Sequence, residues 1–522
     1  MKTDRLLLGL LAAGMLFSCT NEDDGVVDTP VANAKTSYIA VNVNSAYDAT
    51  RADYADGTAE EQAVNNAYFF FFDNAGSPFN VSSEIGGTGV NYIVKTGLGD
   101  EGSVPENVET VTSTILMIRN NKGTNPAKVV AVVNWDYSGV SLSLADLKSQ
   151  LVEEAAAANL ADGFVMSNSV YLSGADVMDA TPITVANISS TETGAVASPV
   201  DIYVERVAAK VAMSQASELF DTGIENPYAP GTNFYVKVLG WDLNTTISHS
   251  NLVKSIEASW TDDNLGIVGW NIEAYKRSFW GKSAEIAGSV VLNKSFNWNS
   301  LSNEVDAADY CLENTSGENT KVLVKAQIAD ADGNPVEVVK LLGEYLTIDA
   351  LKTSIATALA SKYYSYENST YTSIAPADIE LAVAGTSDVD SYTVTYKLTT
   401  AAESKVWKVR NADGVTFADV TVDDLNAALD ALEHAQVWKN GMSYYFADIK
   451  HLGAAGKSGE YGVVRNHSYA VNVTDIVGLG TPVYDGDSVV EEPVSPSDTE
   501  SYIAARINVL SWKLVNQNVS LK

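Results

Sequence analysis

Few residues in this sequence stand in a pattern that could perform chemistry. Histidine, which often serves as a metal ligand or general base, occurs only at His249, His434, His451 and His467. No two of these have the spacing that places two ligands on one helix face, and the HExxH, GxSxG and CxxC motifs are all missing. We therefore predict no catalytic residue, no metal site and no cofactor, and we do not expect an enzyme.

Two segments come close to a phosphate-binding loop. Gly281-Lys282-Ser283 and Gly456-Lys457-Ser458 match the end of that motif. Five residues before each glycine, however, stand Lys276 and His451, where the motif requires another glycine. We expect both segments to be ordinary loops.

Sugar chemistry is the alternative that the composition leaves open. With 66 Asp and Glu in the chain, some carboxylates must be near neighbours, as a glycosidase requires. Trp260, Trp270 and Trp280, with Trp298 beyond them, have a regular spacing that could form a platform for sugar rings. Because tryptophan in β proteins more often packs in cores and interfaces, we favour packing over sugar binding.

The overall charge excludes one class of partner. The 522 residues include 33 Lys and Arg against 66 Asp and Glu, a net charge of -33, so nucleic acid would be repelled. The hydrophobic fraction of 46% is enough for a globular core. The only cysteines, Cys19 and Cys311, cannot build a disulfide framework, and we expect Cys311 to be a small apolar core residue.

The first 19 residues have the pattern of an export signal. Lys2 and Arg5 precede an apolar run that is too short to span a membrane and that stops at Cys19. The run Leu16-Phe17-Ser18-Cys19 resembles a bacterial lipobox, although Phe17 replaces the usual small residue. We predict that Cys19 is acylated. The alternative is an ordinary secretory signal that happens to contain a cysteine.

A strand and an exposed arginine follow the signal. Ile39, Val41 and Val43 alternate with small or polar residues, which predicts a half-buried strand over 37–44. The polar stretch behind it has turn chemistry and little to bury, so Arg51 is expected to be open to a protease.

The rest of the chain mixes strand patterns with a few helices. Strands are predicted at 68–72, 128–135 and 320–328. Amphipathic leucine and isoleucine stripes predict helices around 144–151, 348–359 and 425–432. Because such helices need a sheet to cover, we predict a mainly β protein of two β-sandwich domains with short helices packed outside. The Gly- and Pro-containing stretch 220–232 marks the expected domain boundary.

Longer motifs near the C-terminus carry a family resemblance. Gly441-Met442-Ser443-Tyr444-Tyr445-Phe446 leads to the run Gly-Glu-Tyr-Gly-Val-Val-Arg-Asn-His-Ser-Tyr at 459–469. Supporting motifs stand at 204–211, 276–280, 310–315 and 507–515. Together they resemble the type V fimbrial shaft pilins of Bacteroidia, most closely the minor-fimbrillin branch. The resemblance covers nearly the whole chain and implies transthyretin-like β-sandwich domains.

The resemblance also implies a maturation pathway. In this family a lipidated precursor reaches the outer membrane, and an arginine-specific protease removes the leader through the first strand. Another subunit's C-terminal segment then fills the groove. Cleavage is implied between Arg51 and Ala52, unless Arg51 is merely a loop residue. The strand that leaves would carry Tyr38, Ile39, Val41 and Val43, together with the lipid on Cys19.

The last residues match part of what a donor strand requires. Leu510, Trp512 and Leu514 share one face of a straight strand, whereas the apolar residues after Leu514 point the other way, so a bulge or bend is expected there. An apolar strand at a chain end is expected to dock, either on a neighbour or on its own subunit. The predicted donor residues are Ile507, Val509, Leu510, Trp512, Leu514, Val515, Val519 and Leu521.

These predictions divide the chain into five parts. They are a signal peptide (1–19), a propeptide (20–51), two β-sandwich domains (52–225 and 226–505) and a donor segment (506–522). The predicted function is that of a structural shaft subunit of surface fimbriae, an outer-membrane lipoprotein that becomes an extracellular polymer, and the resemblance adds adhesion and biofilm formation.

The expected partners are copies of the chain itself, minor tip and anchor subunits, the processing protease, a transient lipid anchor, and host or bacterial surface receptors. The alternatives are a tip or anchor subunit and a surface glycan-binding lipoprotein.

Overall fold

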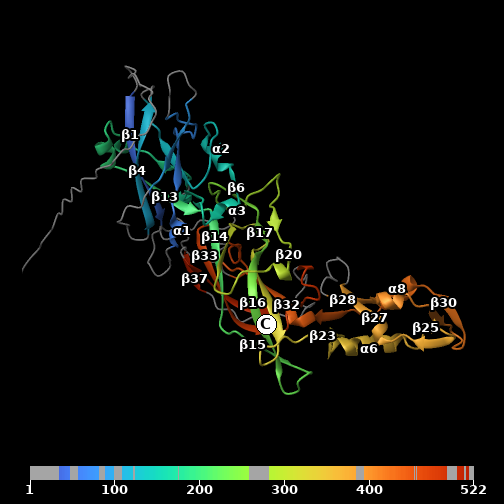
Figure 1. Ribbon diagram of the computed structural model, residues 1–522. Coiled ribbons are helices and arrows are strands. Elements are labelled where there is room, and N and C mark those ends of the chain that lie inside the picture. Colours follow the sequence, from blue (N-terminus) through green and yellow to red (C-terminus); the bar gives the residue numbers. More distant parts are fainter. Residues whose placement is uncertain are drawn as a thin grey trace, which may run out of the picture.

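The computed structural model shows a mainly β protein with a few short helices (Figure 1). Its buried apolar side chains form three large clusters and one small one. It describes residues 35–46, 57–81, 89–98, 108–120, 124–173, 176–257, 281–383, 393–451, 453, 455–490, 502–510 and 513–516.

The first cluster belongs to an N-terminal sheet. The aromatic run predicted as a strand lies in this sheet, with Phe69 to Phe72 fully buried. A short strand, β12 (Thr181–Pro182), pairs with β5 outside the main order. That order is β3 (Tyr92–Thr96), β2 (Asn66–Phe72), β5 (Lys128–Val133), β9 (Met166–Asn168), β13 (Val200–Arg206), β1 (Lys35–Ala46) and β4 (Val108–Asn120).

Two five-stranded sheets enclose the second cluster and form a β-sandwich. Apolar side chains from both sheets, such as Val211 and Val324, are fully buried between them. One sheet has the order β21 (Ala308–Leu312), β14 (Ala208–Gln215), β33 (His467–Val477), β36 (Tyr502–Leu510) and β37 (Lys513–Asn516). The other has the order β15 (Phe220–Glu225), β16 (Asn233–Asn244), β22 (Lys321–Ala329), β32 (Met442–Asp448) and β34 (Thr481–Pro482).

The stretch expected to separate two domains lies inside this sandwich. β15 and β16 pair antiparallel, so residues 226–232 are the loop of a hairpin within one sheet. Turn residues such as Pro227 and Gly231 serve this loop, and the same residue types would also suit a linker. Ala208 belongs to the first buried cluster and Ala209 to the second, and the chain returns to the first cluster at Ile247, Leu252, Val253 and Leu312.

The third cluster belongs to an arm inserted between β22 and β32, which projects away from the sandwich (Figure 1). One of its sheets has the order β24 (Glu344–Leu346), β23 (Val338–Leu341), β31 (Ala435–Trp438), β28 (Thr393–Leu398) and β27 (Ile379–Val383). The other has the order β26 (Thr370–Ser373), β25 (Tyr363–Glu367), β29 (Trp407–Arg410) and β30 (Phe417–Val420). The helices of the arm are α6 (Ile348–Leu359), α7 (Thr400–Glu403) and α8 (Val422–Asp430).

The predicted helices are present, with one correction at residue level. α6 and α8 bury the stripes that predicted them, although Leu432 lies just beyond the end of α8. α2 (Leu144–Lys148) begins after Ser143, whose hydroxyl caps the helix by accepting a hydrogen bond from the Asp146 N–H. Leu151 does not extend this helix, because it lies in β6 (Leu151–Glu153), which pairs with β18 (His249–Asn251). Three further helices are α1 (Ala59–Gln62), α3 (Glu154–Ala157) and α4 (Glu192–Val196).

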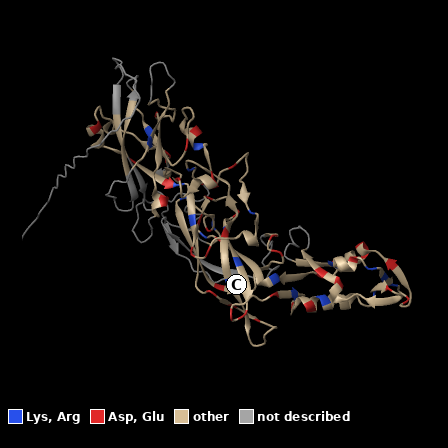
Figure 2. Cartoon of the chain, in the orientation of Figure 1, with Lys and Arg blue, Asp and Glu red and all other residues tan. Residues whose placement is uncertain are grey.

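Acidic residues are spread along the described parts of the chain, in the sandwich as well as on the arm (Figure 2). Such a distribution is typical of a solvated surface. Within the described residues, no helix has both the length and the apolar composition needed to cross a bilayer.

Candidate assembly site

The strand predicted over 37–44 is present as β1, which is longer by two residues at each end. β1 lies in the interior of the N-terminal sheet, because it pairs with a neighbour on both sides. Along its whole length it runs antiparallel to β4, and over Val41–Ser45 it runs parallel to β13. Ile39 and Val41 are fully buried in the first core cluster, as the alternating pattern predicted.

β4 depends on β1 for its place in the sheet. Among the strands that the structure describes, β1 is the one neighbour with which β4 pairs. If β1 left, the backbone N–H and C=O groups that bond it would be unpaired on β4 and on β13. The vacated positions of Ile39 and Val41 would also expose apolar core. The sheet would then hold a slot for exactly one strand.

The C-terminal strands occupy the edge of a different sheet. β36 pairs antiparallel with β33 over most of its length, and β37 folds back on β36 to pair Asn508 with Asn516. The bend was predicted after Leu514, but β37 already runs antiparallel to β36, so Leu510 and Leu514 lie in two strands of opposite direction and not on one straight strand. In this structure the segment docks on its own subunit.

Only some of the predicted site residues lie in the described parts of the chain. Tyr38, Ile39, Val41 and Val43 are in β1, the first three donor residues (Ile507, Val509 and Leu510) are in β36, and Leu514 and Val515 are in β37. The predicted residues outside the described parts are Cys19, Arg51, Ala52, Trp512, Val519 and Leu521.

A buried polar cluster holds the chain shortly after the predicted cleavage position. The Glu61 side chain is fully buried, and its Oε1 accepts hydrogen bonds from Lys210 Nζ at 2.7 Å and from the Tyr310 hydroxyl at 2.5 Å. The guanidinium Nε of Arg206 donates to the backbone oxygen of Glu61 at 2.8 Å. Burial alone would raise the pKa of Glu61, but the bonds from Lys210 and Tyr310 outweigh it and hold the pKa below its usual value. A charged Glu61 thus ties α1 to β14 and β21.

Two buried ion pairs lie beside this polar cluster. We call the cluster and the two ion pairs together the junction. Arg465 Nε lies 2.9 Å from Glu313 Oε2, and Lys254 Nζ lies 2.9 Å from Glu205 Oε2, with all four side chains at most 2% exposed. Burial raises the pKa of Glu205 to about 7 even though Lys254 opposes the shift. Loss of one partner would leave a buried charge unpaired, which costs about 3–5 kcal/mol.

Three of the motifs that predicted the family meet at this junction. Glu205 and Arg206 come from the motif at 204–211, Glu313 from that at 310–315, and Arg465 from the run at 459–469. Sequence reasoning did not predict that these charged residues contact one another. The nearest available signal was the presence of Glu and Arg inside otherwise apolar strand patterns, where a charge must be paired.

In the two segments that resemble a phosphate-binding loop, the glycine N–H groups donate hydrogen bonds to carboxylates of the chain itself. The Gly281 N–H donates to Glu313 Oε1 at 2.8 Å, and the Gly456 N–H donates to Glu460 Oε2 at 2.6 Å. A carboxylate therefore occupies the position that a phosphate would need, and both segments are the loops that the sequence predicted. Cys311 is buried as expected, and burial raises the pKa of its thiol well above the ordinary value.

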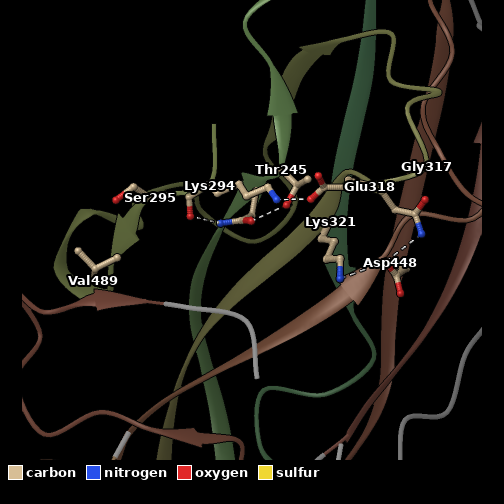
Figure 3. A pocket seen from close by; sticks show the side chains of 10 residues that line it. Thr245, Lys294, Ser295, Gly317, Glu318, Lys321, Asp448 and Val489 are labelled. Atoms are coloured by element: carbon tan, nitrogen blue, oxygen red, sulfur yellow. Dashed lines mark hydrogen bonds and ion pairs between the residues drawn. The ribbon is translucent and has the colours of Figure 1, made fainter. Parts of the chain in front are cut away.

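A pocket of about 590 Å³ beside the sandwich is lined mainly by polar residues (Figure 3). Its charged side chains pair with one another: Lys321 with Asp448 at 3.5 Å, and Lys294 with Glu318. Within the described residues, no group of three His, Cys, Asp or Glu is placed to hold a metal ion. Among the described residues that line the pocket, both carboxylates are paired with a lysine and none is aromatic.

The tryptophans considered for sugar binding give no platform within the described residues. Trp260, Trp270 and Trp280 lie outside them. Trp298 packs beside Lys325, and its indole N–H donates to the backbone oxygen of Ser443 at 3.0 Å. Its role in the structure is packing.

Comparison with solved structures finds long but weak likenesses. A candidate cell adhesion protein of Parabacteroides distasonis is 13% identical, with 91% of this chain and 96% of that chain covered and a TM-score of 0.38. A fimbrilin of Porphyromonas gingivalis is 12% identical (91% and 99% covered, TM-score 0.36). The tip fimbrial protein Mfa3 of the same species is 11% identical (91% and 100% covered, TM-score 0.32).

Sequence comparison gives one informative match. Among curated protein sequences, none matches this chain. Residues 436–518, which include β32, β33, β36 and β37, match the family model described as major fimbrial subunit protein type IV, Fimbrillin, C-terminal.

Proposed function

We propose that this chain is a structural subunit of a surface fimbria, exported as a lipoprotein through Cys19 and cleaved after Arg51 by an arginine-specific protease. Its subunits polymerise when the C-terminal segment of one fills the place of β1 in the next. The match of residues 436–518 to the fimbrillin C-terminal model supports the fimbrial part of this proposal. A shaft position, the minor-fimbrillin branch and a role in adhesion and biofilm formation rest on the resemblance.

The observation that carries the proposal is the position of β1. A removable N-terminal strand would ordinarily be expected at a sheet edge, where its loss disturbs little. β1 instead lies between β4 and β13 and fills the core with Ile39 and Val41. Its removal leaves a vacancy with hydrogen-bonding groups on both walls, and another strand can fill it by β-augmentation.

The vacancy specifies its occupant. To reproduce the pairing of β1, which extends over 12 residues, the incoming strand runs parallel to β13 and antiparallel to β4. Apolar side chains must alternate so that two of them take the positions of Ile39 and Val41, each contributing about 1.5–3 kcal/mol by burial. The alternating apolar residues of 506–521 meet this requirement in part.

The donor must first leave its own subunit. β36 and β37 lie at the edge of their sheet, so their departure exposes one side of β33 and leaves the remaining order β21, β14 and β33 intact. An edge hairpin is therefore a less costly loss than an interior strand.

Cleavage is tested by the N-terminus of assembled material. Mass spectrometry of sheared fibres is expected to find subunits that begin at Ala52, and Arg51→Ala is expected to leave lipidated monomers. Arg51→Lys is the matched control, since it keeps the charge but removes the arginine. A dominant species in fibres that retains residues 35–46 would refute the proposed maturation.

The donor role is tested by truncation. A chain that lacks residues 506–522 is expected to fold and to be cleaved but not to extend, which a ladder of polymer sizes on a gel would reveal. Unchanged polymer length would show that the donor assignment is wrong. The abundance of the subunit in fibres separates a shaft subunit, which dominates, from a tip or anchor subunit.

A further inference from the structure

The two halves of β1 have different neighbours on one side. β13 pairs with Val41–Ser45, which leaves the first half of the strand without a β13 partner. There the segment 184–199, which we call the strap, takes over. The Tyr38 N–H donates to the Ser189 backbone oxygen at 2.7 Å, and the Ser189 N–H donates back to the Tyr38 backbone oxygen at 3.0 Å. The strap thus forms one complete β-bridge with β1.

The strap is held in shape by bonds that do not involve β1. The Asn187 side-chain amide donates to the backbone oxygens of Ser198 at 3.1 Å and Pro199 at 3.0 Å, which closes the strap at its base. Asn187 Oδ1 accepts from the Thr184 N–H at 2.9 Å. Farther along, the Thr191 hydroxyl caps α4 by accepting from the Gly194 N–H at 3.1 Å.

Because these bonds are internal and α4 packs against β4 as well as β1, we expect the strap to keep its shape and place when β1 departs, with its pairing groups unused. The Ser189 N–H and C=O would then be directed toward the vacancy, where a backbone pair without partners is costly. A strand that enters the slot regains both bonds only if its residue at the Tyr38 position has an N–H. Neither residues 35–46 nor the predicted donor segment 506–522 contains a proline.

We propose that the strap is a third wall of the strand-accepting slot and that Ser189 is a positioning residue for the incoming strand of a second copy of this chain. This inference rests on the proposed polymerisation and adds to it a fixed register. The occupant is held by β4 along its length, by β13 over its second half and by Ser189 at one point in its first half. A strand shifted by one residue presents the wrong backbone side to Ser189.

The test removes the Ser189 N–H, which donates one of the two hydrogen bonds of the bridge, and changes as little else as possible. Ser189→Pro deletes the N–H, and the preceding Ile188 already has the extended conformation (φ -105°, ψ 119°) that a following proline requires. Two controls separate the effect. Ser189→Ala loses only the hydroxyl, which accepts from the Thr191 N–H, and Ser190→Pro places a proline at the next, exposed position.

The measurement is the rate at which full-length protein polymerises after cleavage by an arginine-specific protease. Ser189→Pro is expected to slow polymer growth about five- to tenfold, the effect of one lost hydrogen bond, while both controls keep the wild-type rate. Equal rates for wild type and Ser189→Pro would overturn the role of the strap alone. Absence of polymer from cleaved wild type would overturn the proposed polymerisation and the strap inference with it.

If Ser189→Pro does not fold, hydrogen exchange on the wild type tests whether the strap pairs with the incoming strand. In the assembled polymer the Ser189 amide is expected to exchange at least about tenfold more slowly than the amide of Ser190, as expected for a bonded group beside an exposed one. Equal exchange at the two positions in the polymer would show that the strap does not pair with the incoming strand.

Discussion

β1 and the C-terminal pair β36 and β37 are both terminal segments of the described chain, yet their sheets depend on them to different degrees. β1 lies between β13 and β4, and β4 pairs with no other strand among those described. β36 and β37 lie at an edge, beyond β33, which keeps β14 on its other side. Loss of β1 would therefore open a sheet in its interior, whereas loss of β36 and β37 would only remove strands from an edge. In the proposed assembly, the C-terminal segment of one subunit, whose departure destabilises its own sheet little, replaces β1 of the next subunit, whose departure destabilises its sheet more.

The largest effect is expected from deleting each segment in turn. Without residues 35–46, β4 loses its one partner among the described strands, and we expect the free energy of unfolding of the N-terminal sheet to fall by about 5 kcal/mol, which lowers the temperature of its cooperative transition but leaves the sheet folded. Without residues 506–522, the temperature of that transition is expected to stay the same. Calorimetry and hydrogen exchange on β4 measure the difference. If the β4 amides stayed protected in the chain that lacks 35–46, β4 would not depend on β1 for its place in the sheet.

A smaller effect is expected from a single side chain of β1. Ile39→Ala in the uncleaved precursor removes a fully buried side chain and is expected to lower the free energy of unfolding by about 2–5 kcal/mol. Met117→Ala is the matched control, because Met117 lies opposite Tyr38 on β4 and is 42% exposed. Its replacement is expected to change stability by less than about 0.5 kcal/mol. Chemical denaturation compares the two, and similar losses would contradict an interior position for β1.

The smallest effect concerns a carboxylate on the far side of the sandwich from β36. Asp242 in β16 is half-buried, and burial, with repulsion from Asp309 in β21, raises its pKa to about 6. Because this value exceeds that of an unfolded Asp, about 3.8, the charged form costs stability above pH 6, and the cost fades as the pH falls from 6 toward 4. Asp242→Asn is therefore expected to raise the melting temperature by about 2–4 °C at pH 8 and by nothing near pH 4.

The control for that change is a carboxylate with the opposite shift. Hydrogen bonds from Thr416 and Val415 lower the pKa of exposed Asp413 on the arm, so Asp413→Asn is not expected to stabilise the protein at pH 8. The gain from Asp242→Asn should also persist in the chain that lacks 506–522, since β21 and β36 lie in different halves of their sheet. If deletion of residues 506–522 removed this gain in melting temperature, the tail would be shown to stabilise the sandwich as far as β21, and not only the sheet edge at β33.

Much of the local structure was predictable from residue patterns. The alternation of Ile39 and Val41 predicted β1, the aromatic run predicted β2, and the stripes of α6 and α8 predicted those helices. Patterns of this kind report which face of an element is buried. They failed at Leu151, where a helical spacing continued by chance into β6, and at residues 226–232, where the turn residues of a hairpin resemble those of a linker.

The candidate site divides in the same way. Residue patterns were sufficient to predict that residues 37–44 form a strand with apolar residues on one face, that Cys311 is a core residue and that the tail contains apolar strand segments. The folded chain was needed to see that β1 is an interior strand, that the tail pairs with its own β33, that Ser189 pairs with Tyr38 and that Glu205, Glu313 and Arg465 meet at one junction. The physical reason is that backbone hydrogen bonds are alike in every strand. A pattern of side chains therefore specifies the buried face, whereas packing of the whole core selects the neighbour.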